Sequence, residues 1–168
     1  MKRIHAISGW TIILVFSLGY PGPLRGRVLP PAIATQTQQA TSGKVTRLLQ
    51  QAGYSHRQTG PNTWVIDRPA GKKGWVLVAA GQEFVVLGII VAEKQNMRVS
   101  ADLSFKLLKL NHDLNYVKVG FDSDDDLFAR VELRIRSVDL PAFKTMYEDV
   151  NSGADKTYEV VRPFLVTP

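Results

Sequence analysis

The stretch from Asn111 to Ile135 limits what this chain can fold into more than any other part of it. Leucines before it recur at helical spacing, at positions 103, 107, 110 and 114, and predict a helix. A short strand at residues 117–121, an acidic tip at 122–126 and a second strand at 127–135 follow. In the second strand, apolar residues alternate with mostly polar ones, which is typical of a strand with one buried face. The stretch therefore predicts a helix that leads into an antiparallel hairpin.

The flanking sequence extends this pattern to a whole domain. Residues 44–52 place apolar side chains on one helical face, and three candidate strands follow at 63–67, 75–80 and 83–92. Ser100 is a suitable cap for the leucine-rich helix, and Asp139 starts a last helix that Pro163 ends. The element order is α-β-β-β-α-β-β-α, with connections too short for parallel crossovers. The predicted fold class is α+β, with an antiparallel β-sheet flanked by helices.

The first 41 residues differ in composition from the rest and predict export. Lys2 and Arg3 precede an apolar run at residues 6–16, which is short of the roughly 20 residues that span a bilayer. Small residues allow cleavage after Gly19 or after Ala34. We therefore expect a signal peptide at 1–19 (or to 34), a flexible linker at 20–41 and the domain at 42–168, in a periplasmic or extracellular protein. An uncleaved membrane anchor and a start-site artefact are the alternatives, and contact with a membrane is expected only through an uncleaved signal.

The net charge of +6 does not indicate a nucleic-acid partner. Four of the basic residues lie before residue 35, where there is no acid, and the chain from Thr35 onward has 17 basic and 15 acidic residues. Nucleic-acid binding needs clustered positive charge on the folded domain. The chain also has no cysteine, which excludes disulfides.

The hairpin at residues 75–92 carries the strongest indication of function. Its strands are apolar on both faces, so that one face can lie under the helices while the other needs a cover. The same chain, a second copy or another protein can supply that cover. The later hairpin adds a cationic strip of Lys118, Arg130, Arg134 and Arg136, interrupted by Glu132. A solvated sheet face is the default interpretation of this strip, and a site for an acidic partner is the alternative. The candidate protein-binding residues are Trp75, Leu77, Phe84, Val86, Arg130 and Arg134.

Catalytic and metal-binding patterns are scarce. Residues 122–126 have acids at alternate positions, as a calcium loop does, but Leu127 and Leu133 stand where such a loop needs glycine and glutamate. The tip is therefore interpreted as a hairpin turn rather than a cation site. His112 and Asp113 have no nucleophile or second histidine at useful spacing and suit a capping or surface role. We expect no enzyme activity, no metal and no cofactor.

Three segments together resemble one known family. They are Leu107-Leu108-Lys109-Leu110-Asn111-His112, the hairpin from Lys118 to Leu133, and Ala154-Asp155-Lys156-Thr157-Tyr158. Over about residues 43–165 the chain resembles the YbjN-like family, which is related in fold to the type III secretion chaperones. The resemblance implies a small, often dimeric α+β domain that binds other proteins.

We therefore expect a non-enzymatic, exported, protein-binding or chaperone-like domain. We also expect a homodimer with the hairpin at 75–92 at or near its interface. The alternative function is a small-ligand or anion-binding sensor domain that uses the cationic strip. The sequence does not identify the client.

Overall fold

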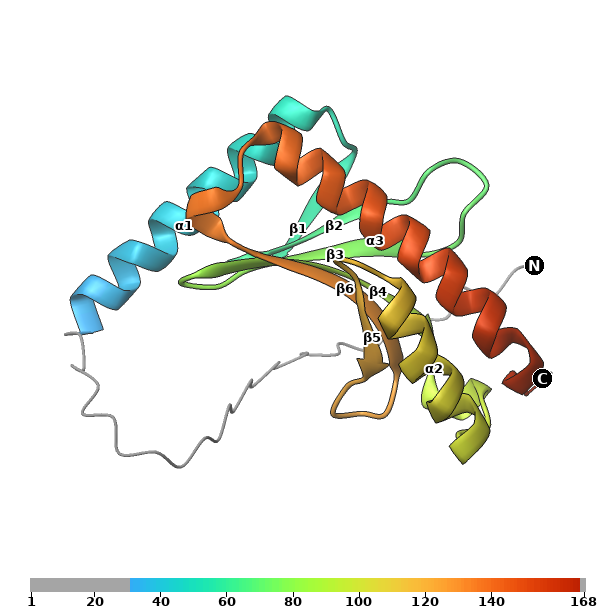
Figure 1. Ribbon diagram of the computed structural model, residues 1–168. Coiled ribbons are helices and arrows are strands. Elements are labelled where there is room, and N and C mark those ends of the chain that lie inside the picture. The colour runs from blue at the N-terminus through green and yellow to red at the C-terminus, as the bar shows by residue number, and fades with distance from the viewer. Residues whose placement is uncertain (1–30, 167–168) are drawn as a thin grey trace, which may run out of the picture.

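A computed structural model describes residues 31–166 as one antiparallel sheet with three helices on one face (Figure 1). The strand order is β1-β2-β3-β4-β6-β5. The strands are β1 (His56–Gly60), β2 (Thr63–Asp67), β3 (Trp75–Ala80), β4 (Phe84–Ala92), β5 (Lys118–Phe121) and β6 (Leu127–Arg134). The helices are α1 (Pro31–Ala52), α2 (Ala101–Asp113) and α3 (Leu140–Val161). This architecture confirms the predicted α+β class.

The hydrophobic core lies between the helices and one face of the sheet. Every second residue of β2, β3, most of β4 and most of β6 is buried there, which is the alternation that a two-faced strand requires. Helix α3 packs across β4 and β6, and α1 packs against α3 and β3. The largest fully buried side chains come from all three helices and from β2, β4 and β6: Leu49, Trp64, Ile66, Leu87, Leu103, Leu127, Phe143 and Met146. Burial of each such side chain contributes about 1.5–3 kcal/mol.

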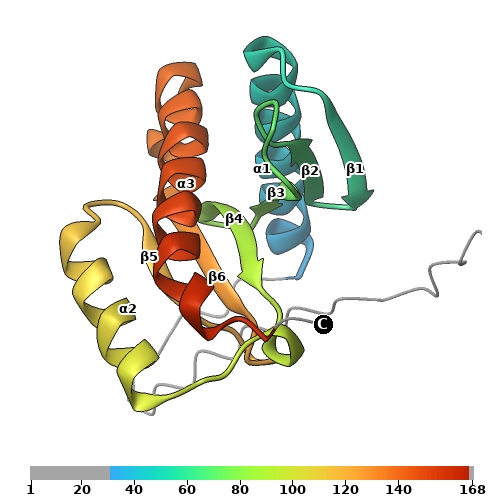
Figure 2. The ribbon, with the colours of Figure 1, turned by 90° about the vertical axis from the view of Figure 1, so that its right-hand side faces the viewer.

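Helix α2 lies beside the C-terminal half of α3, at the β5 end of the sheet (Figure 2). Gly153 of α3 permits a close approach here. A Cβ atom at Gly153 would lie 2.6 Å from Cγ1 of Val117, the residue just before β5. Any larger residue at this position would push the start of β5 away from α3.

Both predicted helix starts are confirmed by their caps. The Ser100 hydroxyl accepts a hydrogen bond from the Leu103 N–H at 3.2 Å. An oxygen of the Asp139 carboxylate accepts one from the Ala142 N–H at 2.8 Å. Each cap satisfies one of the N–H groups that the first turn of a helix leaves without an internal partner.

Two elements differ from the sequence expectation. The polar segment His56–Gly60 was not predicted as a strand, yet it pairs with β2 through its main chain as β1. Its side chains are largely exposed, so that it has no apolar pattern to detect. Helix α1 begins at Pro31, inside the segment expected to be a linker, rather than at residue 44. The apolar contacts that predicted this helix, such as Val45 and Leu49, all lie in its second half.

The connection between β2 and β3 is held against α3 by Arg68. Its guanidinium donates to the side-chain oxygen of Asn151 at 2.8 Å and to the carboxylate of Asp155 at 2.9 Å. Lys72 from the same connection also contacts Asp155, at 2.7 Å. Burial opposes ionisation of Asp155, but the hydrogen bonds from Lys72 and Arg68 outweigh it. They hold the pKa of this carboxyl below its ordinary value.

Among residues 31–166, no helix is both long and apolar enough to cross a membrane. The predicted signal peptide and the first part of the predicted linker lie outside the described residues.

Candidate functional site

The face of the sheet opposite the helices is our candidate site, and we call it the open face. The three helices pack on the other side, and no helix of the described chain covers this one (Figure 1). Cross-strand neighbours define its rows: Ala79, Val86 and Glu132 form one row, and Leu77, Gly88 and Arg130 form the next. The open face consists of Arg57, Thr63, Val65, Asp67, Trp75, Leu77, Ala79, Phe84, Val86, Gly88, Ile90, Lys118, Gly120, Phe128, Arg130, Glu132 and Arg134.

The part of the open face on β3 and β4 is apolar. Trp75 is 60% exposed, Ile90 is 52% exposed and Phe84 is 38% exposed, while Leu77 and Val86 between them are half-buried. On the other side of the same strand, Val85 is fully buried. Large apolar side chains gathered on a surface are typical of a site that contacts another molecule.

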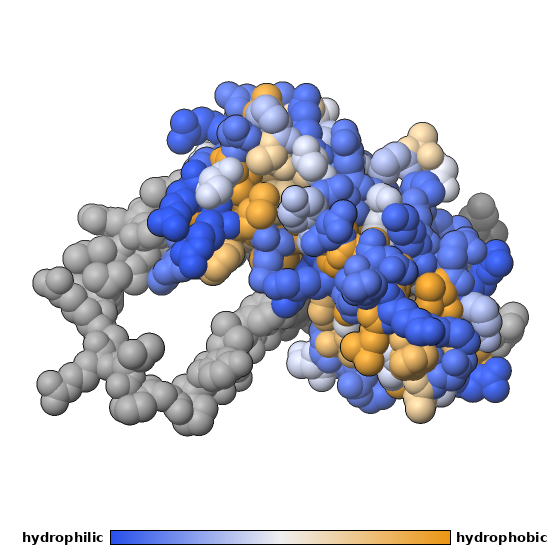
Figure 3. Space-filling view, in the orientation of Figure 1, coloured by the Kyte–Doolittle hydropathy of each residue, from blue (hydrophilic) through white to orange (hydrophobic). Residues whose placement is uncertain are grey.

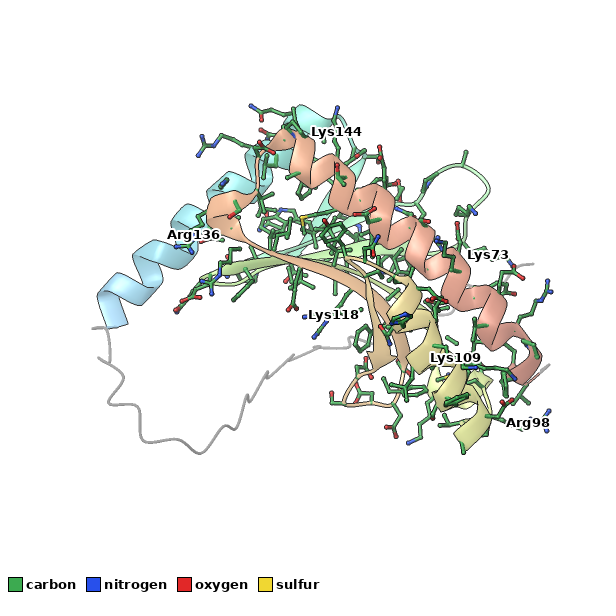
Figure 4. The ribbon with its side chains drawn as sticks, viewed as in Figure 1. Lys73, Arg98, Lys109, Lys118, Arg136 and Lys144 are labelled. Carbon is green, nitrogen blue, oxygen red and sulfur yellow. The ribbon has the colours of Figure 1, made fainter. Side chains whose placement is uncertain are left out.

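The part of the open face on β5 and β6 is mainly cationic. Lys118 points away from the helix layer (Figure 4), and its ammonium contacts Glu132 at 2.6 Å. The Arg130 guanidinium lies 3.7 Å from the same carboxylate and 5.1 Å from the ring centre of Phe128. The hydrogen bond from Lys118 lowers the pKa of Glu132, against the effect of partial burial. Together with Arg134 at the end of β6, three cations and one carboxylate share this side of the face.

Arg134 links the two parts of the open face. Its guanidinium lies 5.3 Å from the ring centre of Phe84, the cross-strand neighbour, and 3.4 Å from the carboxylate of Glu83. A guanidinium near an aromatic ring is attracted to the ring's negative face. This contact keeps an exposed phenylalanine and an exposed cation together at one end of the surface.

The six residues predicted from the sequence all lie on this one face. Trp75 and Leu77 come from β3, Phe84 and Val86 from β4, and the two arginines from β6. Their role in binding stays a prediction. Sequence analysis did not select Ile90 and Phe128, although both share the face. Their alternation with buried neighbours was the signal that would have found them.

Helix α2 presents a second apolar surface that sequence analysis missed. Phe105 is 57% exposed and Leu108 is 68% exposed, while Leu103 and Leu107 on the other side of the helix are buried. Apolar side chains gather over α2 in Figure 3. Val99 and Tyr116, which flank the helix in sequence, are also exposed; we call these four residues the α2 surface. The three-residue step from 105 to 108 was the available signal.

The acidic tip uses its carboxylates to hold its own turn. An oxygen of Asp122 accepts hydrogen bonds from the N–H groups of Asp124 and Asp126, each at 2.9 Å. Asp125 has a φ of 64°, which is the left-handed backbone conformation common in tight turns. Its carboxylate lies 2.6 Å from the ammonium of Lys94. Within residues 31–166, no three histidine or acidic side chains are grouped as metal ligands.

Solved structures of type III secretion chaperones and of YbjN have folds similar to this one. A chain of the ExoU–SpcU complex from the type III secretion system of Pseudomonas aeruginosa has a TM-score of 0.55 and 16% identity, over 70% of this chain and 97% of that one. YbjN from E. coli also has a TM-score of 0.55, with 15% identity over 74% and 95% of the two chains. No protein-family model matches the sequence, and no curated protein does.

The type III secretion chaperone SycH of Yersinia pestis, solved with a fragment of YscM2, has a TM-score of 0.51. It shares 13% identity with this chain over 71% of this chain and 98% of its own. At these identities the likeness concerns the fold alone. The chain therefore has a YbjN-like fold of the kind that type III secretion chaperones share, which confirms the resemblance seen in the sequence.

Proposed function

We propose that this protein is a non-enzymatic, chaperone-like domain that binds other proteins through the open face of its sheet. The observation that carries the proposal is the exposure of Trp75, Phe84 and Ile90 on a face that no described helix covers. Two of the similar structures support it, because each contains a second protein: the ExoU–SpcU complex and SycH with its YscM2 fragment. The client is a polypeptide with exposed apolar segments.

Suppression of aggregation tests this function directly. Reduced insulin is the probe, and light scattering follows its precipitation. Val86→Arg places a charge on the open face, which weakens contact with an apolar client because the charge must lose water. We expect the native protein to slow precipitation and the folded Val86→Arg variant to lose most of that effect. A native protein that leaves the precipitation rate unchanged would contradict the proposal.

Val85→Arg is the matched variant for the same strand. Val85 is fully buried on the helix face, so an arginine there should unfold the domain. Circular dichroism of the two variants therefore separates loss of the surface from loss of the fold. If both variants unfold, the open face is covered in solution and the proposal loses its support.

The sensor alternative receives less support from the geometry. Glu132 contacts both Lys118 and Arg130, and Arg134 contacts Glu83, so a small anion, which offers charge alone and no apolar contact, must compete with carboxylates of this chain for these cations. A thermal shift of the protein with inorganic phosphate tests this alternative. A large stabilisation that Arg130→Ala removes would favour the sensor over the chaperone-like function.

The proposal includes export by the N-terminal signal. Cleavage after Gly19 leaves all of α1 in the mature protein, whereas cleavage after Ala34 cuts inside that helix. We therefore expect a mature chain that begins at Tyr20 in the periplasm or medium. N-terminal sequencing of the exported product checks this, and an intact first residue on a soluble intracellular product would contradict it.

The proposal also includes a homodimer, formed through the α2 surface. In an antiparallel pairing of two α2 helices about a twofold axis, Phe105 of each copy meets Leu108 of the other. Asp102 of one copy then lies within a turn of the other copy's Lys109, so that the charges also match. The open face remains available to a client.

Sedimentation of two charge variants tests the dimer and its interface. Leu108→Glu should yield a monomer, while Val86→Arg should leave the dimer intact. The opposite pattern would return the interface to the β3–β4 hairpin, as expected from the sequence. A native protein that stays monomeric at high micromolar concentration would remove the dimer altogether.

A further inference from the structure

Gly88 places no side chain in the middle of the open face, and we call this position the gap. It lies between Val86 and Ile90 on β4, with Leu77 beside it on β3 and Arg130 beside it on β6. Each of these four neighbours has a side chain on the open face. Side chains therefore surround this position on β3, β4 and β6, while the position itself has none.

The fold itself does not require glycine at this position. A Cβ atom at Gly88 would meet its nearest atom, Cβ of Arg130, at 3.7 Å, which is an ordinary van der Waals distance. Its φ is not among the positive values that favour glycine. Glycine in the interior of a strand weakens the strand, and it often marks a place where a ligand or another chain comes close. Packing within the chain therefore does not explain why β4 has a glycine at this position.

We propose that the gap at Gly88 is an anchor site for one apolar side chain of a protein partner, next to an acidic residue of that partner. This inference rests on the function proposed above. Leu77, Val86 and Ile90 supply apolar walls on three sides of the gap. Arg130 forms the fourth wall and belongs to the cationic part of the face. An aliphatic or aromatic side chain fits the walls, and a carboxylate one or two residues away on the partner reaches the guanidinium.

Charge complementarity selects this occupant over parts of the protein itself. The first 30 residues include an apolar run, but they contain Lys2, Arg3, Arg25 and Arg27 and no acidic residue. They therefore lack the charge that the cationic side of the open face attracts. A second copy placed face to face would bring the Arg130, Arg134 and Lys118 groups of both copies together. Like charges in contact oppose such a pairing.

A peptide array provides the probe because the natural partner is unidentified. The peptides are about ten residues long and carry a leucine or phenylalanine, with glutamate, serine or lysine at the neighbouring positions. Binding of the native protein is compared with that of Gly88→Leu, Gly88→Ala and Val86→Arg. Gly88→Leu fills the gap, and its thermal unfolding temperature should equal or exceed that of the native protein, because leucine suits a strand better than glycine does.

We expect the native protein to prefer peptides with glutamate beside the apolar residue. Gly88→Leu should weaken that binding about tenfold or more, since the anchor side chain loses its buried position. Gly88→Ala should weaken it less, and Val86→Arg should abolish it. Measurement of Kd for the best peptides by fluorescence anisotropy gives these ratios.

Three results would overturn the inference. If Gly88→Leu binds within twofold of the native protein while Val86→Arg does not bind, the open face binds proteins but the gap is not the anchor. If lysine-containing peptides bind as well as glutamate-containing ones, the partner has no acidic residue next to its anchor side chain, and the inference is wrong on that point. If the native protein binds no peptide on the array, both the anchor site and the proposed function fail.

Discussion

Asn111 of α2 holds both main-chain polar groups of Val119 in β5. Its side-chain nitrogen donates to the Val119 carbonyl oxygen at 2.7 Å, and its side-chain oxygen accepts from the Val119 N–H at 2.8 Å. A neighbouring strand would make the same pair of hydrogen bonds. The amide of Asn111 thus replaces the missing neighbour at this edge of the sheet and protects it from pairing with another chain.

Loss of these two hydrogen bonds should destabilise the folded protein and expose β5 at the edge of the sheet. Asn111→Leu removes two hydrogen bonds from partly buried main-chain groups, so we expect the free energy of unfolding to fall by about 1–3 kcal/mol. Denaturant titration measures the change. The neighbouring His112→Ala is the control, because His112 is exposed and should change the stability by less than about 0.5 kcal/mol. Equal effects of the two changes would show that the edge contact has no energetic role.

The register of β6 makes a second prediction. Leu127 is fully buried on the helix face, whereas Arg134 is exposed on the open face. Leu127→Ala should therefore cost about 2–5 kcal/mol, since it leaves a cavity in the core. Arg134→Ala should stay within about 0.5 kcal/mol. Comparable losses in a denaturant titration would mean that the two faces have been assigned the wrong way round.

Sequence patterns sufficed for elements whose signal is local. Ser100 and Asp139 cap their helices as predicted, since a cap depends only on the next three residues. The continuous apolar strand Phe84–Ala92 indicated two covered faces, and the structure shows which of them the helices cover. The polar strand β1 escaped detection because main-chain pairing with β2, rather than its side chains, holds it in the sheet.

The candidate site was predictable in part. Continuous apolar residues identified Trp75 and Phe84, but the gap at Gly88 depends on the alignment of three strands that no single segment encodes. Phe105 and Leu108 were missed because the leucine stripe on the buried side of α2 already accounted for that helix. The role of Asn111 depends on the docking of α2 against β5, which is a tertiary contact.

The carboxyl of Asp155 predicts a dependence of stability on pH. Its pKa is lowered in the folded protein by Lys72 and Arg68, in spite of partial burial. A lowered folded pKa adds stability above the unfolded value of about 3.9, and that stability is lost as the pH falls through the folded pKa. The native protein should thus be more stable than Asp155→Asn at pH 6. The difference should shrink as the pH falls below about 4.

Asp149 is the control for this pH series because its shift has the opposite sign. Burial, with a smaller effect of Glu148, raises the pKa of its carboxyl in the folded protein. Ionised Asp149 therefore costs stability at neutral pH, and protonation removes the cost. Asp149→Asn should be at least as stable as the native protein at pH 6, with an advantage that fades in acid. The same pH profile for both variants would show that the contacts of Asp155 with Lys72 and Arg68 do not cause the dependence of stability on pH.

The close approach of Gly153 to Val117 makes the last prediction. A Cβ at Gly153 would overlap Cγ1 of Val117, and the segment before β5 must move to admit it. We expect Gly153→Ala to lower the free energy of unfolding by about 1–3 kcal/mol, although alanine favours helices.

Gly43→Ala in α1 is the control, since no atom lies within 4 Å of its Cβ position. That change should raise stability by about 0.5–1 kcal/mol. In a Val117→Ala background, where the overlapping methyl groups are absent, Gly153→Ala should lose most of its cost. An undiminished cost there, measured by the same denaturant titration, would show that contact with Val117 is not what requires glycine at this position.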